Sequence, residues 1–446
     1  MTHRAANRIG IIGGGIIGLC SAYYLQKAGY QVTVFEQNAL AEGCSMGNAG
    51  MIVPSHIIPL AQPGMIAKGL RWMLSPTSPF YVKPRLNADL MRWGWLFYRH
   101  STPQHVERAI PALRDLSLLS KKLYQELAQP GVARPGVARP GVAANGDADG
   151  QPLDFGWHER GLLMLYKTPA AEHDMAEEAD VANRAGVEAR ILTGQQVQDL
   201  EPDARVTVRG GILYPGDAHL DPGRLVHALI TYLRRRGVEI HDQTTVTGLV
   251  RERGRVTMVQ TNTGDFPVDE LVVAGGAWSS SLARKLALRL PLQGGKGYSF
   301  MLAGESTPGV TDNIRVPAIM LEARATATPI GNDLRFAGTL EVAGTDLSVN
   351  MNRVRGIVQS INQYYPDIRV DMPRVEAVWS GLRPCSPDGL PYIGRVPQAE
   401  NVIVATGHGM MGLSLGPATG KLVADAIAGN IPVLDMDSFS PGRFSA

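Results

Sequence analysis

The first residues that could do chemistry are a set of glycines followed by a carboxylate. Gly13, Gly15 and Gly18 have the spacing GxGxxG, and Glu36 lies 21 residues beyond Gly15. In this spacing the first glycine allows a tight turn, the second lets the backbone approach a pyrophosphate, and the third lets a helix pack closely on a strand. A carboxylate at the position of Glu36 accepts hydrogen bonds from ribose hydroxyls. The pattern therefore predicts a dinucleotide site.

The elements that would position these residues follow from the hydrophobic pattern around them. Arg8–Ile12 is short and apolar, as in a buried strand, and apolar residues recur at helical spacing after Gly15. Gly29 would close this helix, and a second strand is predicted over Gln31–Phe35. This order is the first half of a Rossmann-type fold, in which the helix N-terminus attracts the phosphates of FAD or NAD.

Residues 41–52 distinguish between these two cofactors. A nicotinamide-binding domain would form a second crossover helix here, whereas the segment AEGCSMGNAGMI is small, polar and rich in glycine. A loop of this composition either lies against a planar ring system, to which it offers backbone N–H groups, or is an irregular surface loop.

Composition and charge limit the other classes of protein. The 446 residues are 44% hydrophobic and 19% charged, which is typical of a globular protein with two domains. The net charge of +2 gives no reason to expect nucleic acid as a partner. Cys20, Cys44 and Cys385 are few and widely spaced, and neither a signal peptide nor an apolar run of about 18 residues is evident. We therefore expect a reduced, cytoplasmic protein without a metal site.

Two segments in the middle of the chain have unusual compositions. Residues 65–100 combine three tryptophans with several basic residues, so they form either a surface that rests on an anionic membrane or helices with the tryptophans in their core. Residues 130–150 contain a tandem PGVAR repeat, whose proline and glycine exclude a helix and a regular strand. We expect a surface insertion there, without a catalytic role.

Further elements are predicted from the same patterns. They are a strand pair over residues 157–168 and helices over 106–128, 170–186, 222–236 and 355–365. Residues 271–283 form a buried strand that meets a Gly-Gly turn, which is either a ligand-binding edge or an ordinary connection. From residue 292 onward an antiparallel sheet is expected, in which Tyr298 and Arg335 either belong to a site or are solvated.

The C-terminal third holds the remaining candidate chemistry. Arg383 lies in the segment GLRPCSPDGLPYIG, and its guanidinium would either bind a carboxylate through two hydrogen bonds or form an ion pair between domains. His408, Met410 and Met411 lie in the segment NVIVATGHGMMGLSLGPATG, which predicts a strand, a glycine-rich loop and a helix. The helix N-terminus would stabilise negative charge on a cofactor. His408 either faces that cofactor or caps the loop, and the two methionines either line a pocket or pack in the core.

Four segments together resemble a known family: GGGIIG, GCSMGNAGMIVP, GLRPCSPDGLPYIG and ATGHGMMGLSLGPATG. They are similar to motifs of the FAD-dependent D-amino-acid oxidase superfamily, above all of bacterial D-amino-acid and D-hydroxyproline dehydrogenases. The resemblance covers residues 8–430 apart from the insertion and is weakest over 90–205. It implies an α/β fold in which a Rossmann-like FAD-binding domain (8–60, 206–285 and 376–446) is interleaved with an α+β substrate domain built on an antiparallel sheet (61–205 and 286–375).

The resemblance also implies the residues that bind the cofactor. We expect non-covalent FAD, because Cys385 does not match the cysteine to which sarcosine oxidases attach their flavin. The predicted FAD-binding residues are Gly13, Gly15, Ile16, Ile17, Gly18, Glu36, Gln37, Ser45, Asn48, Ala49, Gly50, Met51, Val246, Gly275, Trp278, Gly409, Met410, Met411, Gly412 and Leu413.

The activity that the resemblance implies is oxidation of a D-amino acid, or of a cyclic D-imino acid such as D-proline or D-hydroxyproline. Hydride would pass from the substrate Cα to flavin N5, and the imino acid would hydrolyse to a 2-oxo acid and ammonia. Arg383 would bind the substrate carboxylate, Tyr298 and Met410 would contact the substrate, and His408 is a second catalytic candidate. Positioning would supply much of the rate. A respiratory quinone or another acceptor would take the electrons, and this role favours membrane contact by residues 65–100.

Two alternatives stay open. One is an oxygen-using oxidase of glycine, sarcosine or another secondary amine. Met410 stands where glycine oxidase has an arginine, which argues against glycine itself. The other alternative is a non-enzymatic FAD-binding electron-carrier subunit, and Arg383 within its full motif argues against it.

Overall fold

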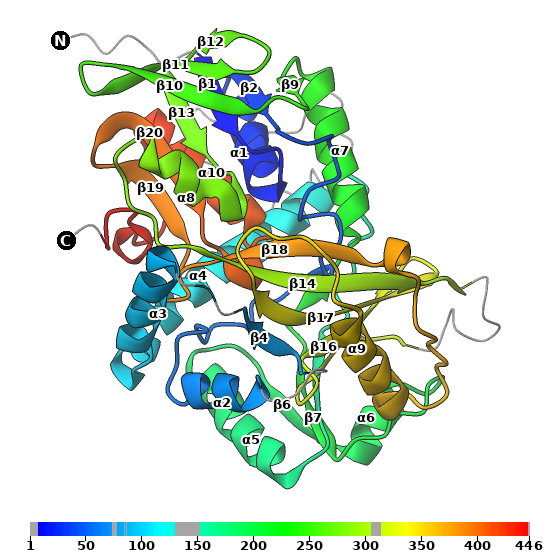
Figure 1. The fold of residues 1–446 in the computed structure, drawn as a ribbon. Coiled ribbons are helices and arrows are strands. Elements are labelled where there is room, and N and C mark those ends of the chain that lie inside the picture. The colour runs from blue at the N-terminus through cyan, green and yellow to red at the C-terminus, as the bar shows by residue number, and fades with distance from the viewer. Residues whose placement is uncertain are drawn as a thin grey trace, which may run out of the picture.

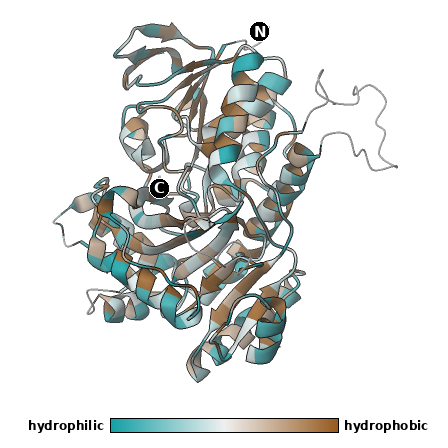
Figure 2. Cartoon of the chain, turned by 90° about the vertical axis from the view of Figure 1, so that its right-hand side faces the viewer, coloured by the Kyte–Doolittle hydropathy of each residue, from teal (hydrophilic) through white to brown (hydrophobic). Residues whose placement is uncertain are grey.

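The molecule is built on two sheets that lie one above the other (Figure 1). A computed structural model describes residues 8–73, 78–83, 85, 87–129, 152–304 and 314–444. The insertion predicted over residues 130–150 lies outside these described residues. Figure 2 shows hydrophobic residues concentrated in the strands and hydrophilic residues on the outer faces of the helices, as expected when sheets bury their faces against helices.

The upper sheet has six strands in the described part of the chain: β1 (Arg8–Ile12), β2 (Gln31–Phe35), β9 (Glu239–His241), β13 (Glu270–Val273), β19 (Tyr392–Val396) and β20 (Ala399–Thr406). Their order is β19-β20-β13-β1-β2-β9, and all neighbours are parallel except β19 and β20. Because the carboxyl ends of parallel strands meet at one edge, Gly13, Glu36 and Gly275 follow their strands at the same edge of the sheet.

Both faces of this sheet are covered, as parallel strands require. One face packs against α1 (Ile16–Lys27), α7 (Pro222–Arg235) and α10 (Gly416–Ala428), through buried residues such as Leu19, Leu229 and Val423. The other face packs against α8 (Ser279–Arg284) and the strands β10 (Val246–Glu252), β11 (Arg255–Thr261) and β12 (Asp265–Pro267).

The lower sheet is larger and mostly antiparallel. Among the described residues its strands are β4 (Phe80–Val82), β5 (Leu162–Tyr166), β6 (Arg190–Thr193), β7 (Gly210–Tyr214), β14 (Gln293–Leu302), β15 (Ala318–Met320), β16 (Ala325–Ile330), β17 (Asp333–Val342) and β18 (Trp379–Cys385). Their order is β18-β14-β17-β16-β15-β5-β7-β6, with β4 beside β17. The helix α9 (Met351–Tyr364) packs against β16 and β17, where Ile357 and Ile361 are buried.

Several connections tie the two sheets together. A short antiparallel ribbon is formed by β3 (Met51–Ile52) and β8 (Ala218–His219), in which Met51 pairs with His219 and Ile52 with Ala218. The long helix α4 (Pro103–Ala128) packs against α10, although the predicted boundaries assign α4 to the substrate domain. The remaining helices are α2 (Met65–Trp72), α3 (Ala88–His100), α5 (Pro169–Arg184), α6 (Gly194–Leu200), and the single turns η1 (Gly276–Trp278), η3 (Val375–Ala377), η4 (Gly409–Met411) and η5 (Asp437–Phe439).

Most predicted elements are confirmed, and β1 and β2 have the predicted bounds. The predicted strand pair over residues 157–168 is wrong, because β5 is the strand there and His158 forms an isolated bridge with His219. Gly156 and Gly161 adopt φ angles of 63° and 79°, which interrupt an extended strand. The described residues between 65 and 100 include two helices, α2 and α3, with β4 between them.

Candidate functional site

The turn after β1 has the packing that the glycine spacing predicts. Gly13 has φ of 112°, and a Cβ on it would lie 2.5 Å from the carbonyl oxygen of Ala274. A Cβ on Gly18 would lie 1.9 Å from the carbonyl oxygen of Gly13, so helix α1 approaches the turn too closely for any side chain. At Gly15, by contrast, a Cβ would meet only Ser45 Oγ, at 3.6 Å. The N-terminus of α1 is therefore open beside Gly15, where a pyrophosphate would bind.

The carboxylate of Glu36 is fixed beside this turn. One of its oxygens accepts a hydrogen bond from the Gly14 N–H at 2.8 Å, and the other accepts one from the Asn38 N–H at 3.0 Å. The side chain stays partly exposed at the end of β2, with Gln37 exposed next to it and Val246 beginning β10 nearby in the adjoining sheet. An acceptor held in this way is suited to a ribose hydroxyl.

The segment from Ser45 to Gly50, called the 45–50 loop below, is held from both sheets. Ser45 Oγ accepts a hydrogen bond from the Ile16 N–H of α1 at 3.0 Å. From the lower sheet, Ser299 Oγ donates to the Gly47 carbonyl oxygen at 2.8 Å. Because partners on β14 and on α1 hold it, the loop has a fixed path between the sheets.

Arg335 on β17 also holds the 45–50 loop. Its Nη1 donates to the carbonyl oxygens of Met46 and Asn48, at 3.0 and 2.8 Å. Burial lowers the pKa of its guanidinium, and Asp221 partly offsets this effect. The sequence left Arg335 as either a site residue or a solvated one, and the structure shows that it positions the loop.

A second glycine-rich loop, residues 407–414, is held by residues that the sequence did not indicate. Tyr124 on α4 is fully buried, and its hydroxyl donates to the carbonyl oxygen of Leu413 at 2.7 Å. Ser414 Oγ accepts a hydrogen bond from the Val53 N–H at 3.0 Å. These partners lie hundreds of residues apart in the chain, so no local motif identifies them.

The end of β13 completes the upper edge of the site. The Ala274 N–H donates to the carbonyl oxygen of Ile12 at 2.8 Å, which places Gly275 beside the glycine turn. Thr406 Oγ1 donates to the carbonyl oxygen of Gly276 at 2.9 Å, so the turn η1 with Trp278 lies next to the end of β20. The structure thus brings the predicted FAD-binding segments to one edge.

Arg383 lies on β18 opposite Gly295 of β14. Its Nη1 donates to the carbonyl oxygen of Thr339 at 2.7 Å, and it forms no ion pair with any residue that the structure describes. A Cβ on Gly297 would lie 2.2 Å from Arg383 Nη1, so the guanidinium lies directly over this glycine. Burial lowers the pKa of Arg383. A desolvated guanidinium without a carboxylate partner is prepared to bind one.

The carbonyl group that holds Arg383 belongs to a strained residue. Thr339 has φ of 67°, which a β-branched residue rarely adopts, and its buried Oγ1 lacks a hydrogen-bond partner within the described structure. The strain falls where the pairing of β14 and β17 shifts by one residue, between Lys296 and Tyr298. This bulge directs the Thr339 carbonyl oxygen at the guanidinium.

The structure does not bring Tyr298 together with Arg383, which corrects the expectation that Tyr298 contacts substrate. Alternate residues of a strand point to opposite faces, so Tyr298 lies on the face of β14 opposite to Gly297. Its side chain is 1% exposed, and its hydroxyl donates to Glu341 Oε2 at 2.9 Å and accepts from the Asn350 N–H at 3.2 Å. Tyr298 supports the sheet from within the core.

His408 is buried and neutral. Its side chain is 4% exposed, its Nε2 lies 2.9 Å from Thr419 Oγ1, and burial lowers its pKa to about 3. Burial disfavours the charged form of the ring, and the contact with Thr419 on α10 shows that His408 supports the loop from within the protein. Of the two methionines, Met410 is 52% exposed, whereas Met411 packs against the buried clusters of both domains.

Trp379 on β18 is a further site residue that the sequence analysis did not select. A Cβ on Gly47 or on Gly381 would lie 2.0 Å from its indole ring, so the ring occupies the space that these two glycines leave. Trp379 therefore connects the 45–50 loop to the strand that carries Arg383. The only sequence signal for it is its place four residues before Arg383.

These residues fit FAD. Gly15 and the start of α1 leave room for a pyrophosphate, Glu36 presents an acceptor for a ribose, and the 45–50 loop and the 407–414 loop approach the lower sheet near Arg383. A dinucleotide that spans this edge would extend from the upper sheet to the guanidinium. The fold and site together define a two-domain FAD-binding oxidoreductase.

The chain belongs to the family described as FAD dependent oxidoreductase, whose model matches residues 8–426. It is 31% identical over 447 residues to a D-amino acid dehydrogenase of Methylobacterium nodulans, with 98% of this chain and 99% of the relative covered. It is 32% identical over 447 residues to a D-amino acid dehydrogenase of Cereibacter sphaeroides, with 98% and 96% covered. The predicted oxidoreductase class and the FAD cofactor are confirmed.

Solved structures agree on the fold. Glycine oxidase from Geobacillus kaustophilus superimposes with a TM-score of 0.71 at 23% identity, covering 98% of this chain and 99% of that one. L-proline dehydrogenase from P. horikoshii superimposes with a TM-score of 0.73 at 18% identity, covering 99% and 98%. The predicted fold, a Rossmann-like domain with an α+β domain on an antiparallel sheet, is therefore confirmed.

Replacing Gly297 by alanine should weaken the binding of carboxylates without releasing FAD. The new Cβ would lie 2.2 Å from Arg383 Nη1, too close for both atoms, and would push the guanidinium away from Thr339. We expect the dissociation constant of a simple carboxylate such as benzoate, titrated by flavin absorbance, to rise about tenfold or more. Gly216→Ala is the matched control, because a Cβ there meets no atom within 4 Å. Equal affinities for the two variants would contradict the role given to Arg383.

Replacing Arg335 by methionine should weaken FAD binding. The variant keeps the apolar length of the side chain and removes both hydrogen bonds to the 45–50 loop. Because two partly buried carbonyl groups lose a charged donor, we expect the FAD dissociation constant to rise about tenfold or more in a fluorescence assay of released flavin. Arg205→Met removes an exposed arginine that pairs with Asp367 and serves as the control. Unchanged FAD affinity would show that Arg335 does not position the loop.

Proposed function

We propose that this chain catalyses the FAD-dependent oxidative deamination of D-amino acids, giving an imino acid and then a 2-oxo acid and ammonia. The observation that carries the proposal is Arg383, a desolvated guanidinium without a carboxylate partner among the described residues, on the strand beside the 45–50 loop. The likeness to D-amino acid dehydrogenases over nearly the whole chain supports this substrate class.

The residues of the chain would act chiefly by positioning the substrate. Arg383 would bind the carboxylate through two N–H groups, while Thr339 holds a third and so fixes the plane of the guanidinium. The carboxylate so fixed determines which face of Cα is presented towards the 45–50 loop. When bound, FAD would supply the acceptor for a hydride, and hydrolysis of the released imino acid requires only water. His408, being neutral, would hold the second loop in place.

The large side chains that we assign to the proposed substrate site, besides Arg383, are apolar. Met410 is 52% exposed, and Trp379 lies between the 45–50 loop and Arg383. Neither side chain can pair with a second carboxylate, so we expect uncharged side chains on the preferred amino acid. Cyclic D-imino acids such as D-proline and D-hydroxyproline are included in the proposal, because an apolar pocket accepts their rings.

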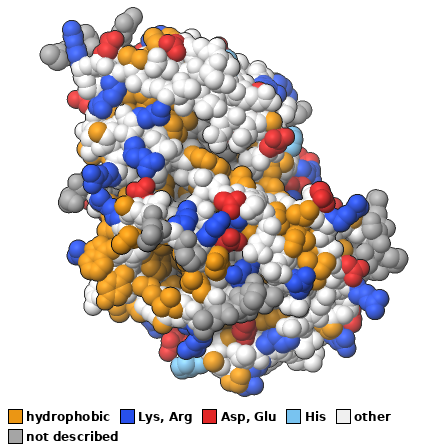
Figure 3. Space-filling model, in the orientation of Figure 1, with side chains coloured by type: hydrophobic (Ala, Val, Ile, Leu, Met, Phe, Trp, Pro, Cys, Tyr) orange, Lys and Arg blue, Asp and Glu red, His pale blue; other side chains and the backbone are white. Residues whose placement is uncertain are grey.

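We also propose that the helices α2 and α3 contact an anionic membrane, where a respiratory quinone could take the electrons. Large apolar side chains are exposed on these helices: Leu70 (62%), Met91 (69%), Trp95 (59%) and Tyr98 (61%). Figure 3 shows hydrophobic side chains gathered at the lower left, where Figure 1 places these helices. Basic residues accompany them, and apolar side chains with basic neighbours suit an anionic bilayer surface. None of the described helices is long and apolar enough to cross a membrane.

The test of the activity is an anaerobic absorbance assay with D- and L-amino acids, glycine, sarcosine, D-proline and cis-4-hydroxy-D-proline. We expect D-substrates to bleach the flavin bands and L-isomers to leave them unchanged. Arg383→Lys keeps the charge and loses the planar fork, so the apparent substrate dissociation constant should rise about tenfold or more while FAD stays bound. Bleaching by glycine or sarcosine alone, followed by rapid reoxidation in air, would instead identify an oxidase. If nothing bleaches FAD-loaded protein, the electron-carrier alternative replaces the proposal.

The test of membrane contact is cosedimentation with vesicles that contain phosphatidylglycerol. We expect the wild-type chain to sediment with them and the double variant L70E/W95E to stay in the supernatant, because two exposed apolar side chains become carboxylates that anionic lipid repels. Ile191→Glu changes another exposed apolar residue, 53% exposed on β6, and should sediment like the wild type. Equal sedimentation of all three proteins would rule out this surface.

A further inference from the structure

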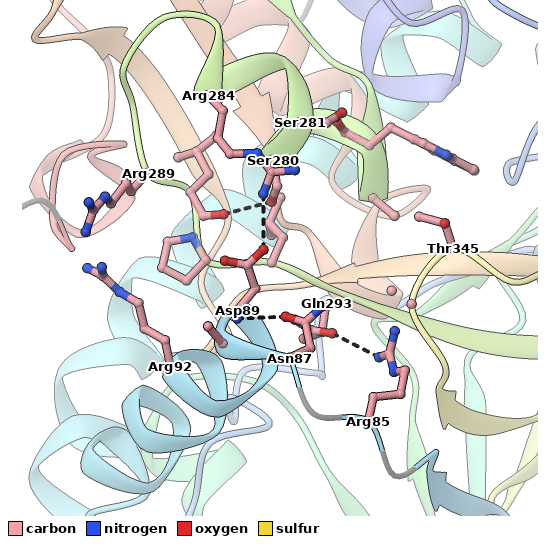
Figure 4. Close-up of a pocket in the computed structure, with 18 residues that line it drawn as sticks. Arg85, Asn87, Asp89, Arg92, Ser280, Ser281, Arg284, Arg289, Gln293 and Thr345 are labelled. Atoms are coloured by element: carbon pink, nitrogen blue, oxygen red, sulfur yellow. Dashed lines mark hydrogen bonds and ion pairs between the residues drawn. The ribbon is translucent and has the colours of Figure 1, made fainter.

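A cavity of about 740 Å³ borders the site described above at η1 and extends away from it. It is formed by α3 and the segment before it, by η1 and α8, and by residues 289–294 (Figure 4). Its lining includes neither the glycine turn, the 45–50 loop nor the 407–414 loop, and it shares only Trp278 with the predicted FAD contacts. Small-molecule sites commonly have volumes of about 300–1,000 Å³. The cavity is therefore large enough for a ligand of its own.

The charge of the cavity is strongly positive. The lining residues include four arginines and a single carboxylate: Arg85, Arg92, Arg284, Arg289 and Asp89. Asp89 is already paired, since Arg284 Nη1 lies 3.1 Å from its Oδ2. The other three arginines form no ion pair within the described part of the chain. Three uncompensated guanidinium groups from separate elements thus face one cavity.

The hydrogen-bonding capacity of these arginines is incompletely used. Arg85 Nε is buried without a hydrogen-bond partner, and Arg85 Nη2 reaches only Gln293 Oε1, at 3.5 Å. Arg92 Nη2 donates to the Phe444 carbonyl oxygen at 3.2 Å. The other N–H groups of Arg92 remain available to a ligand. Buried donors without acceptors are costly, so a missing acceptor is indicated near Arg85.

The arrangement of the arginines also points to a ligand. Figure 4 shows Arg92 and Arg289 on one side of the cavity and Arg85 on the other side, beyond Asn87 and Gln293. Cations placed around one cavity attract an anion, and this attraction depends on salt because Arg289 is exposed and Arg92 is partly exposed. An anion in the cavity would balance part of this positive charge and supply acceptors for the N–H groups of Arg85.

We propose that this cavity binds a phosphate group. Guanidinium groups match the oxygens of phosphate in geometry, and several cations around one cavity suit an anion with more than one negative charge. The phosphate could belong to a soluble small molecule or to the headgroup of an anionic phospholipid. The second source is considered because α3, which lines the cavity with Arg92, exposes Met91, Trp95 and Tyr98 at the surface.

The first experiment is calorimetric titration of FAD-loaded protein with inorganic pyrophosphate. Loading with FAD fills the predicted dinucleotide site, so that heat reports binding elsewhere. We expect saturable binding that weakens as salt is raised, and about tenfold weaker binding for Arg85→Gln and for Arg289→Gln. Arg205→Gln, which removes an exposed arginine paired with Asp367, should bind like the wild type. Equal weakening by this control would show a general charge effect and overturn the proposal.

The second experiment distinguishes the two sources with phosphatidylglycerol and phosphatidylcholine vesicles. A soluble source is supported when pyrophosphate binds and Arg289→Gln sediments like Arg205→Gln. A lipid source is supported when Arg289→Gln sediments less than Arg205→Gln with the anionic vesicles and pyrophosphate displaces the wild type. The proposal fails when pyrophosphate does not bind and the two variants sediment equally. No amino acid is present in either experiment, so failure here leaves the proposed D-amino acid oxidation untouched.

Discussion

The site depends on the hydrogen bonds that hold the 45–50 loop between the two sheets. The loop has no regular secondary structure, so its path is set by partners outside it: the start of α1, Ser299 and Arg335. The same bonds fix the distance between the dinucleotide edge of the upper sheet and the strand that carries Arg383. If the loop were free, other contacts would still join the two sheets, but the cofactor edge and Arg383 would lose the segment that lies between them and orients one against the other.

Arg335 on β17 and Arg383 on β18 show how one side-chain type serves two purposes on the two strands that flank β14. Both guanidinium groups are desolvated and have lowered pKa values. Arg335 has two carbonyl partners in the 45–50 loop, whereas Arg383 has the one carbonyl of Thr339 and no carboxylate among the described residues. A cation with its donors satisfied stabilises the fold, and a cation with donors left open gains most when an anion arrives. This difference in partners, and not burial, separates a positioning residue from a substrate-binding one.

Short sequence motifs predicted the upper sheet well, but they did not predict the residues that hold the two loops and Arg383 in place. The glycine spacing, Glu36 and the strands beside them follow from residues close together in the chain, so β1, α1 and β2 could be predicted from the sequence. Tyr298 was misassigned because the sequence does not show which face of β14 meets the site, and alternate residues of this strand point to opposite faces. Tyr124 and Thr339 could not be found, because their roles depend on contacts with distant segments.

The strain at Thr339 is explained by the requirement on Arg383. In a regular pairing of β14 and β17 the carbonyl at this position would bond to the neighbouring strand, and the guanidinium would lie over Gly297 without an anchor. The bulge rotates that carbonyl towards Arg383, at the cost of an unfavourable φ and an unpaired Oγ1. Glycine would adopt this φ without strain, but it would equally adopt a negative φ, and the carbonyl would then no longer point at Arg383. A threonine fixed by its surroundings keeps the carbonyl directed at the guanidinium. The strained backbone at Thr339 therefore orients Arg383 before a carboxylate binds.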